Sequence, residues 1–200
     1  TIEYLNSENI DYTFTEFNSG ICEGMNRASK KAKFDYILYA HDDFYFCPDW
    51  DNVLINEVKM IGHKNFYLSG IMMHNGPLKF DCGDDINSFD ENKLLSNYKN
   101  VNHYDFQGST WAPHLISKEL WNTVGGFSEE FYPGTGSDPD LNMKLWLEGV
   151  RIFKGLGNFR VYHFGSISLR KKDQLKRNKG SKTFLKKWGF SIKFFTKHYL

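Results

Sequence analysis

The sequence has few cysteines and no apolar run long enough to cross a bilayer. Its three cysteines, Cys22, Cys47 and Cys82, are odd in number and far apart, and no CxxC pair occurs. We expect free, buried thiols in a reducing compartment rather than a disulfide framework or a zinc site. A membrane-spanning helix needs about 20 consecutive apolar residues, and no stretch of the chain reaches that length. The sequence therefore predicts neither a disulfide-stapled domain nor a membrane span.

Internal repeats, low-complexity segments and linkers rich in Pro, Gly or Ser are also missing. The 200 residues, of which 40% are hydrophobic and 24% charged, are typical of one globular domain with its own core. Aromatic residues are numerous at 17%. They indicate core packing first, and ring stacking on a sugar second.

The net charge of +1 conceals an uneven distribution. Segment 170–200 holds eleven of the 25 Lys and Arg but only one of the 24 Asp and Glu, Asp173. We therefore divide the chain into a body, 1–169, and a basic, partly helical C-terminal tail, 170–200. Such a tail is typical of contact with a phosphate-bearing ligand or an anionic membrane surface, and less so here of nucleic acid. A solvated helix face explains the charge equally well.

Strand-like and helix-like segments alternate along the body. Strands are predicted at 12–15, 36–40, 66–72, 150–153 and 160–164, and helices at 20–33, 48–61, 117–124, 138–149 and 183–200, the last interrupted at Gly189. A polar loop is predicted at 74–100. This alternation predicts a Rossmann-like three-layer α/β/α sandwich with a mostly parallel sheet.

Two adjacent carboxylates, Asp42 and Asp43, follow His41 and the apolar strand 36–40. Open α/β sheets bind ligands at the carboxyl ends of their strands. Neighbouring like charges repel unless a cation or hydrogen bonds compensate, and Mg²⁺ and Mn²⁺ prefer oxygen ligands. The motif indicates a divalent cation, although a solvated turn is the commoner explanation for an isolated Asp-Asp pair.

Another acid, Asp138, begins the predicted helix 138–149 after the glycine-containing stretch 133–136. The helix dipole favours an ionised acid at this end, and an ionised carboxylate facing a cleft is what a general base requires. An ordinary N-terminal capping role is the alternative, and Asp140 is explained equally well as a first-turn acid.

A histidine, His163, ends the predicted strand 160–164. A neutral imidazole in such a place can bind a metal. Alone, it is more often a structural residue with satisfied hydrogen bonds.

In order and together, these motifs resemble those of glycosyltransferase family 2, a family of inverting, metal-dependent enzymes with the GT-A fold. The likeness spans about 18–165 and is far more specific than any one motif. The segments that carry it are Asn18-Ser19-Gly20, Gly24-Met25-Asn26-Arg27-Ala28, Asp35 to Asp43, Gly125 to Phe131, Ser137-Asp138-Pro139-Asp140-Leu141, and His163.

The resemblance implies a hexosyltransferase-like enzyme that moves a sugar from a nucleotide-diphosphate sugar to an acceptor hydroxyl. It implies a cation, Mn²⁺ or Mg²⁺, bound by Asp43 and His163 with His41 as a further ligand, and Asp138 as the catalytic base. The implied donor-binding residues are Asn18, Gly20, Asn26, Asp42 and Asp43, and the implied acceptor-binding residues are Trp111 and Asp140.

A UDP-sugar is the first candidate donor, and the acceptor is a saccharide, a lipid-linked molecule or a protein. Polysaccharide biosynthesis in the cytoplasm, at the inner face of a membrane that the basic tail contacts, is the role expected by analogy.

The sequence departs from the family pattern in three places. His41 replaces the usual first Asp of the metal motif, as in a related subset, and Ser137 replaces the usual Glu before Asp138. The usual apolar first strand has no counterpart before Tyr12. A non-catalytic nucleotide- or sugar-binding module on a decayed GT-A fold is therefore the alternative. A metal-dependent hydrolase is less favoured, because no His-x-His or HExxH motif occurs.

Overall fold

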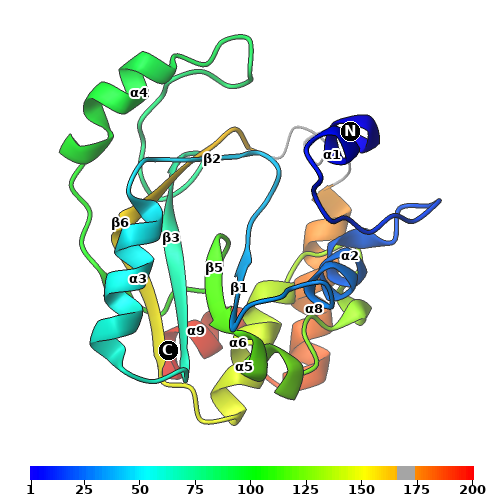
Figure 1. Ribbon diagram of the computed structural model, residues 1–200. Coiled ribbons are helices and arrows are strands. Elements are labelled where there is room, and N and C mark those ends of the chain that lie inside the picture. The colour runs from blue at the N-terminus through cyan, green and yellow to red at the C-terminus, as the bar shows by residue number, and fades with distance from the viewer. Residues whose placement is uncertain (166–173) are drawn as a thin grey trace.

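A six-stranded sheet lies at the centre of the protein (Figure 1). The computed structural model describes residues 1–165 and 174–200, and for 174–178 it describes the backbone alone. The strands run in the spatial order β1-β5-β3-β6-β2, and β4 pairs with β6 outside this path. Their bounds are β1 Tyr36–Tyr39, β2 Phe44–Phe46, β3 Phe66–His74, β4 Phe106–Gln107, β5 His114–Ser117 and β6 Ile152–His163.

The sheet is mostly antiparallel, so the prediction of a mostly parallel sheet is wrong. Among the described strands, β3 and β6 run parallel, whereas β1–β5, β3–β5, β2–β6 and β4–β6 are antiparallel. The cause is largely β5, which lies between β1 and β3 and runs opposite to both. This strand has four residues, of which His114 and Ser117 are polar, so no apolar run marks it in the sequence.

Helices cover both faces of the sheet (Figure 1), which confirms the three-layer α/β/α arrangement. Neighbouring residues of β3 show the alternation, because Leu68 packs with Leu54 of α3 while Tyr67 packs with Trp121 of α5 and Leu141 of α6. The helix bounds are α1 Ile2–Ser7, α2 Gly20–Ser29, α3 Trp50–Ile61, α4 Glu91–Asn97, α5 Lys118–Thr123, α6 Ser137–Leu147, α8 Gln174–Trp188 and α9 Ile192–His198, with 3-10 helices η1 Tyr98–Asn100 and η2 Glu129–Phe131.

Three further local predictions meet a mixed outcome. The predicted strand 12–15 is not formed, and Phe14 is 61% exposed, so no described strand pairs with this segment. The two predicted strands 150–153 and 160–164 form one strand, β6, whose pairing with β3 shifts register between Ser69 and Ile71. The predicted loop 74–100 contains α4, which Asp90 caps by accepting a hydrogen bond from the Lys93 backbone at 2.8 Å.

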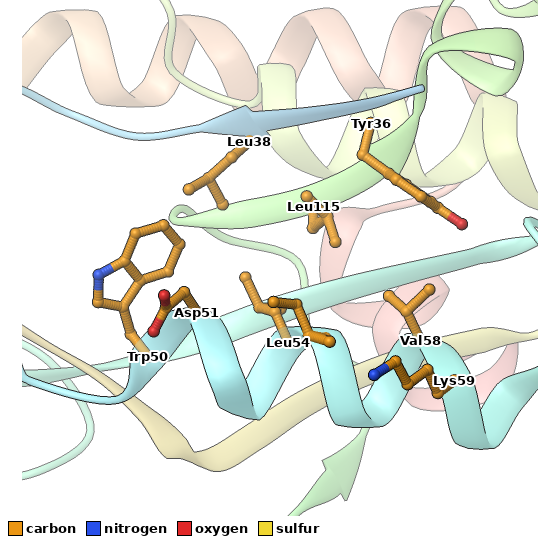
Figure 2. A pocket seen from close by; sticks show the side chains of 9 residues that line it. Tyr36, Leu38, Trp50, Asp51, Leu54, Val58, Lys59 and Leu115 are labelled. Atoms are coloured by element: carbon orange, nitrogen blue, oxygen red, sulfur yellow. The ribbon is translucent and has the colours of Figure 1, made fainter. Parts of the chain in front are cut away.

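An apolar groove runs beside β1 on the α3 face of the sheet (Figure 2). The strand β1 ends the spatial order, and α3 lies closer to β6 than to β1. The groove is lined mainly by Tyr36, Leu38, Trp50, Leu54, Val58 and Leu115. Charged groups of the candidate site described below do not line it.

The C-terminal helices α8 and α9 belong to the same core as α6. Phe184 of α8 and Phe195 of α9 are fully buried there, and Gly189, with φ of 80°, ends α8 as the sequence predicts. A Cβ at Gly180 would collide with the Thr135 carbonyl oxygen, so the backbone of α8 contacts the loop before α6 directly. The three cysteines are free and buried, as predicted. No helix in the described ranges is both long and apolar enough to cross a membrane.

Candidate active site

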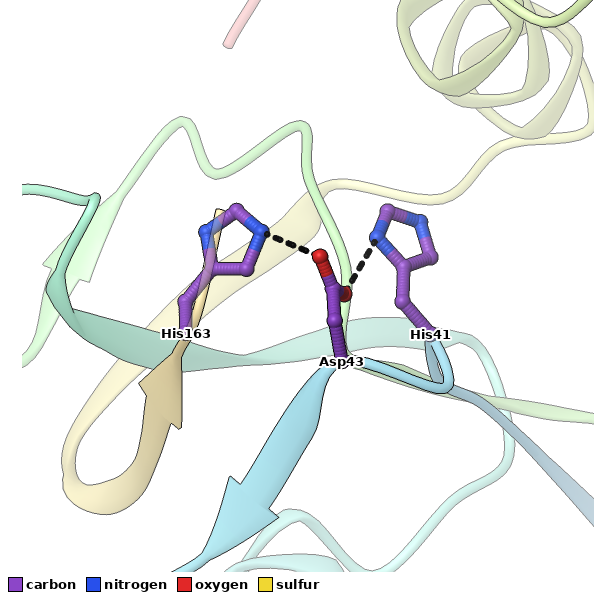
Figure 3. Close-up of side chains that lie close together, drawn as sticks. All are labelled: His41, Asp43 and His163. Carbon is purple, nitrogen blue, oxygen red and sulfur yellow. Dashed lines mark ion pairs between the residues drawn. The ribbon is translucent and has the colours of Figure 1, made fainter. Parts of the chain in front are cut away.

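Two histidines and an aspartate converge where β1 and β6 end (Figure 3). His41 and Asp43 lie in the turn between β1 and β2, and His163 lies opposite Phe44 in the β2–β6 ladder. The Asp43 carboxylate is between the rings, with Oδ2 at 3.3 Å from His163 Nε2 and Oδ1 at 3.9 Å from His41 Nδ1. One ligand atom from each residue lies within 4.8 Å of the others. The structure thus brings together the three metal ligands expected from the sequence.

Hydrogen bonds behind the cluster orient both rings. His163 Nδ1 is 2.9 Å from the Asn75 carbonyl oxygen. A carbonyl only accepts, so Nδ1 donates this bond, and the neutral form of the ring then carries its lone pair on Nε2, the atom that faces Asp43. His41 Nε2 is 2.8 Å from the Tyr39 hydroxyl. Burial lowers the pKa of His41, which favours the neutral, ligating imidazole.

The fourth expected residue, Asp138, lies in the first turn of α6. Gly136 precedes the helix with φ of 87°, a conformation that glycine adopts without strain. The Asp138 side chain is 26% exposed, but its Oδ1 atom is buried and has no hydrogen-bond partner within the described residues. Burial raises the pKa of Asp138 from 3.8 to about 7. A carboxyl group with this pKa exchanges protons readily near neutral pH.

A tyrosine lies between the cluster and Asp138. Tyr39 is 1% exposed, bonds to His41 through its hydroxyl, and has a pKa raised by burial and then by the charge of Asp138. Its ring is 4.9 Å from that of His114, whose Nδ1 is 4.0 Å from Asp138 Oδ1. Asp138 and the cluster therefore belong to one connected set of side chains.

The residues expected at the donor have local structural contacts. Asn18 Oδ1 accepts a hydrogen bond from the Gly20 backbone at 3.0 Å, at the start of α2. The Asn26 amide bonds both the N–H and the carbonyl of Phe127, each at 2.9 Å, and so fixes the loop after α5. Asp42 is exposed beside the cluster. Donor binding by these residues stays a prediction.

The two residues expected at the acceptor differ in their surroundings. Trp111 is half-buried, donates from Nε1 to the Gly70 carbonyl at 3.1 Å, and stacks on Phe106 at 5.5 Å. Asp140 is fully buried, and its carboxylate is bonded by Ser128, Trp188 and Lys187. Asp140 therefore offers no exposed surface to an acceptor, and Trp111 offers part of its ring.

Sequence reasoning did not identify Tyr39, Asn75 or His114 as parts of this site. Tyr39 lies within an apolar run that also fits a plain buried strand, and Asn75 contributes only its backbone carbonyl. His114 belongs to the unpredicted strand β5. Pro113 directly before His114 indicates that a new secondary-structure element begins there. This proline is the sequence signal that could have pointed to β5.

The fold is that of the GT-A glycosyltransferases, as comparison with solved structures shows. A crystal structure of GalNAc-T7 with UDP, GalNAc and Mn²⁺ aligns with a TM-score of 0.58 and 16% identity over 81% of this chain and 33% of that one. A structure of S. aureus TarS 1–349 aligns with a TM-score of 0.55 and 15% identity over 97% of this chain and 60% of that one. The chain thus spans less than two thirds of either protein. Identities this low show the fold alone.

Sequence comparisons add no relative. No protein-family model matches the chain, and no curated protein matches it. Membership of family 2 in particular is not confirmed by any of the comparisons.

Proposed function

We propose that this chain is a metal-dependent inverting glycosyltransferase of family 2 type, which transfers a sugar from a nucleotide-diphosphate sugar to an acceptor hydroxyl. The observation that supports it best is the meeting of His41, Asp43 and His163 at the end of the sheet, where Tyr39 lies between them and the partly buried carboxyl group of Asp138. The proposal is also supported by the GT-A fold, which this chain has in common with the glycosyltransferases described above.

The donor atoms of the cluster fit a divalent cation. Two imidazole nitrogens and a carboxylate oxygen are close enough to share one ion, and the Asn75 carbonyl selects the tautomer in which the neutral His163 ring offers Nε2 to a metal. Imidazole ligands favour a transition metal, so Mn²⁺ is preferred here over Mg²⁺. The GalNAc-T7 crystal structure contains UDP and Mn²⁺, which supports a UDP-sugar and Mn²⁺ as the first donor and cation to test. When bound, the cation neutralises charge that develops on the diphosphate leaving group.

Asp138 is proposed as the general base. Its side chain is 26% exposed and its Oδ1 is buried, so we assign the proton-accepting role to the other oxygen, Oδ2. As the acceptor oxygen attacks the anomeric carbon, its proton passes to Asp138 Oδ2 and the bond from that carbon to the diphosphate oxygen breaks. Attack on the face opposite the leaving group inverts the anomeric configuration. A base with a pKa near 7 is matched to this task at neutral pH.

Peripheral contact with an anionic membrane, through the tail, is a further part of the proposal. The segment 174–200 contains no Asp or Glu. Among the residues whose side chains are described, its exposed lysines are Lys179, Lys182, Lys186, Lys187, Lys193 and Lys197. Lys187 differs because it is bonded to Glu130 and Asp140. The first residues of the basic tail, 170–173, lie outside the described residues.

The proposal is tested by nucleotide release from UDP- and GDP-activated sugars in the presence of Mn²⁺. We expect release from one of them, and a loss of roughly 10²- to 10⁴-fold in Asp138→Asn with nucleotide binding retained. Glu119→Gln, which replaces an exposed carboxylate on α5, is the control and keeps full activity. Binding without any release would identify a non-catalytic module instead, and absence of both would contradict a donor site.

A further inference from the structure

A fully buried histidine, His114, lies against the candidate base. It is the first residue of β5, has no exposed surface, and its Nδ1 is 4.0 Å from Asp138 Oδ1. The proposed function gives this residue no task. Neither the metal cluster nor the acceptor hydroxyl is its hydrogen-bond partner.

The hydrogen bonds of His114 fix which ring nitrogen carries the proton. The Tyr67 hydroxyl is 3.0 Å from the Trp111 carbonyl and 2.9 Å from His114 Nδ1. Tyr67 has one proton, and the carbonyl can only accept it, so His114 Nδ1 supplies the proton of the second bond. Burial lowers the pKa of His114 to about 3, so the ring is neutral and Nδ1 is its single N–H donor.

The ring is also fixed sterically. It packs between the rings of Tyr39 at 4.9 Å, Tyr67 at 4.6 Å and Phe127 at 6.2 Å. Because its position is set from three sides, its N–H dipole has a constant direction relative to α6. Of the two side chains, that of Asp138 is the more exposed, at 26% against 0% for His114.

We propose that His114 is the positioning residue of Asp138, and that its Nδ1–H, which donates to the Tyr67 hydroxyl, also stabilises the ionised carboxylate that accepts the proton. This inference rests on the proposed function for its catalytic meaning, but the pairing can be measured without turnover. When the carboxyl group loses its proton, a rotation of Asp138 that shortens the 4.0 Å separation lets its Oδ1 share the Nδ1–H with the Tyr67 hydroxyl. The other carboxylate oxygen then stays directed to the acceptor.

Other titratable groups face Asp138, and three of them carry no charge near pH 7. They are Tyr39 of β1, Tyr67 of β3 and Cys22 of α2, all of which have a pKa raised by burial and remain neutral near pH 7. Asp140 is on the same helix turn and is already paired with Lys187. The ionisation of Asp138 is therefore expected to respond to His114 in particular.

The test measures the pH dependence of unfolding free energy for four pairs of variants, each with and without Asp138→Asn. The backgrounds are the original chain, His114→Phe, His114→Asn and Tyr36→Phe. Phe keeps the ring packing but removes the donor, Asn places an amide N–H near the position of Nδ1, and Tyr36→Phe is a control on the opposite face of the sheet. Within each pair, the difference in unfolding free energy caused by Asp138→Asn changes with pH until Asp138 is fully ionised in the folded state. The pH at which this difference levels off therefore reports the pKa of Asp138.

We expect this pH to rise by roughly half to one unit in His114→Phe, a three- to tenfold change in the acid dissociation constant, because the carboxylate loses a donor. It should return close to the original value in His114→Asn and not change in Tyr36→Phe. Identical values in all four backgrounds would overturn the proposal.

A measurement on the unaltered chain covers the case in which His114→Phe does not fold. In a ¹⁵N-histidine spectrum, the Nδ1–H resonance of His114 should shift with pH around the Asp138 pKa, and a resonance that does not respond would also overturn the pairing. Nucleotide release separates the two proposals. If the pairing is found but no sugar donor is turned over, the proposed function fails alone. If turnover needs Asp138 but no pairing is found, the positioning role of His114 fails alone.

Discussion

Two aspartates on the first turn of α6 are expected to affect stability in opposite directions when each is replaced by asparagine. Asp140 is fully buried, accepts hydrogen bonds from Ser128 at 2.6 Å and Trp188 at 2.9 Å, and lies 3.0 Å from Lys187 Nζ. Asp138 is partly exposed, and its buried oxygen has no hydrogen-bond partner within the described residues. Hydrogen bonds and an ion pair therefore compensate the burial of the Asp140 carboxylate, whereas the buried oxygen of Asp138 lacks such compensation within the described residues.

The magnitudes follow from these contacts. Removing one partner of a buried, hydrogen-bonded ion pair costs about 3–5 kcal/mol. Because Lys187 keeps Glu130 at 2.7 Å and asparagine keeps one acceptor oxygen, we expect about 2–3 kcal/mol for Asp140→Asn, which lowers Tm by roughly 4–12 °C in a chain of this size. For Asp138, a pKa raised from 3.8 to about 7 corresponds to at most about 4 kcal/mol.

The sign for Asp138 depends on pH. Its folded-state pKa lies above the unfolded value, so its contribution to stability is fully present below pH 3.8 and is lost as the pH rises through about 7. Asparagine does not ionise, so Asp138→Asn avoids the loss of stability that ionisation of Asp138 causes. Its stabilising effect should therefore be near zero at pH 3.5, grow between pH 4 and pH 7, and level off above that.

Urea unfolding of both variants between pH 4 and pH 8 measures the two effects, and each variant is the control for the other. The expected result at pH 8 is a lower midpoint for Asp140→Asn and a higher one for Asp138→Asn. Two variants that both destabilise, or an Asp138→Asn effect independent of pH, would refute the assignment of a compensated and an uncompensated carboxylate.

Two further substitutions test the contacts around the site. Tyr39→Phe removes the hydroxyl behind His41 and should weaken Mn²⁺ binding by about tenfold with little change in the circular dichroism spectrum, whereas Tyr36→Phe on the opposite face should leave Mn²⁺ affinity unchanged. Equal affinities in the two variants would show that Tyr39 does not orient the ligand. Gly180→Ala should destabilise the fold by about 2 kcal/mol or more, because the added Cβ collides with the carbonyl of Thr135. Gly24→Ala is the control. This glycine lies within α2 with no atom near its Cβ position, so alanine should stabilise the fold by about 0.5–1 kcal/mol. A thermal shift of the same sign for both glycines would contradict the close contact between α8 and the loop before α6.

The sequence was sufficient for the features that local physics determines. The apolar run ending at Tyr39 predicts a buried strand whatever its neighbours are, and the charged residues that follow it must then lie at the edge of a sheet. The same reasoning places His163 at the end of β6 and Asp138 at the start of α6. The GT-A fold was predicted from the ordered motifs, and the structural comparisons confirm it.

Features that depend on contacts between residues far apart in the chain could not be predicted from the sequence. Strand direction is one, since β5 is short and its pairing with β1 and β3 is decided by tertiary packing. The burial of Asp140 is another, because it requires Lys187 and Trp188 from a helix more than forty residues away. In the basic tail, aromatic residues interleaved with lysines fit packing on the domain and contact with a membrane equally well, and the structure shows that Phe184 and Phe195 are buried in the core.

The central claim is that His41, Asp43 and His163 bind a cation that a nucleotide needs, and calorimetry of UDP and GDP with and without Mn²⁺ tests it most directly. The chain should bind one nucleotide only with Mn²⁺, and Asp43→Asn should weaken that binding by more than about tenfold. Asp35→Asn, an exposed acid at the other end of β1 that pairs with Lys64 at 2.8 Å, should bind like the original chain. Binding that is equally tight without Mn²⁺, or unchanged in Asp43→Asn, would contradict the account.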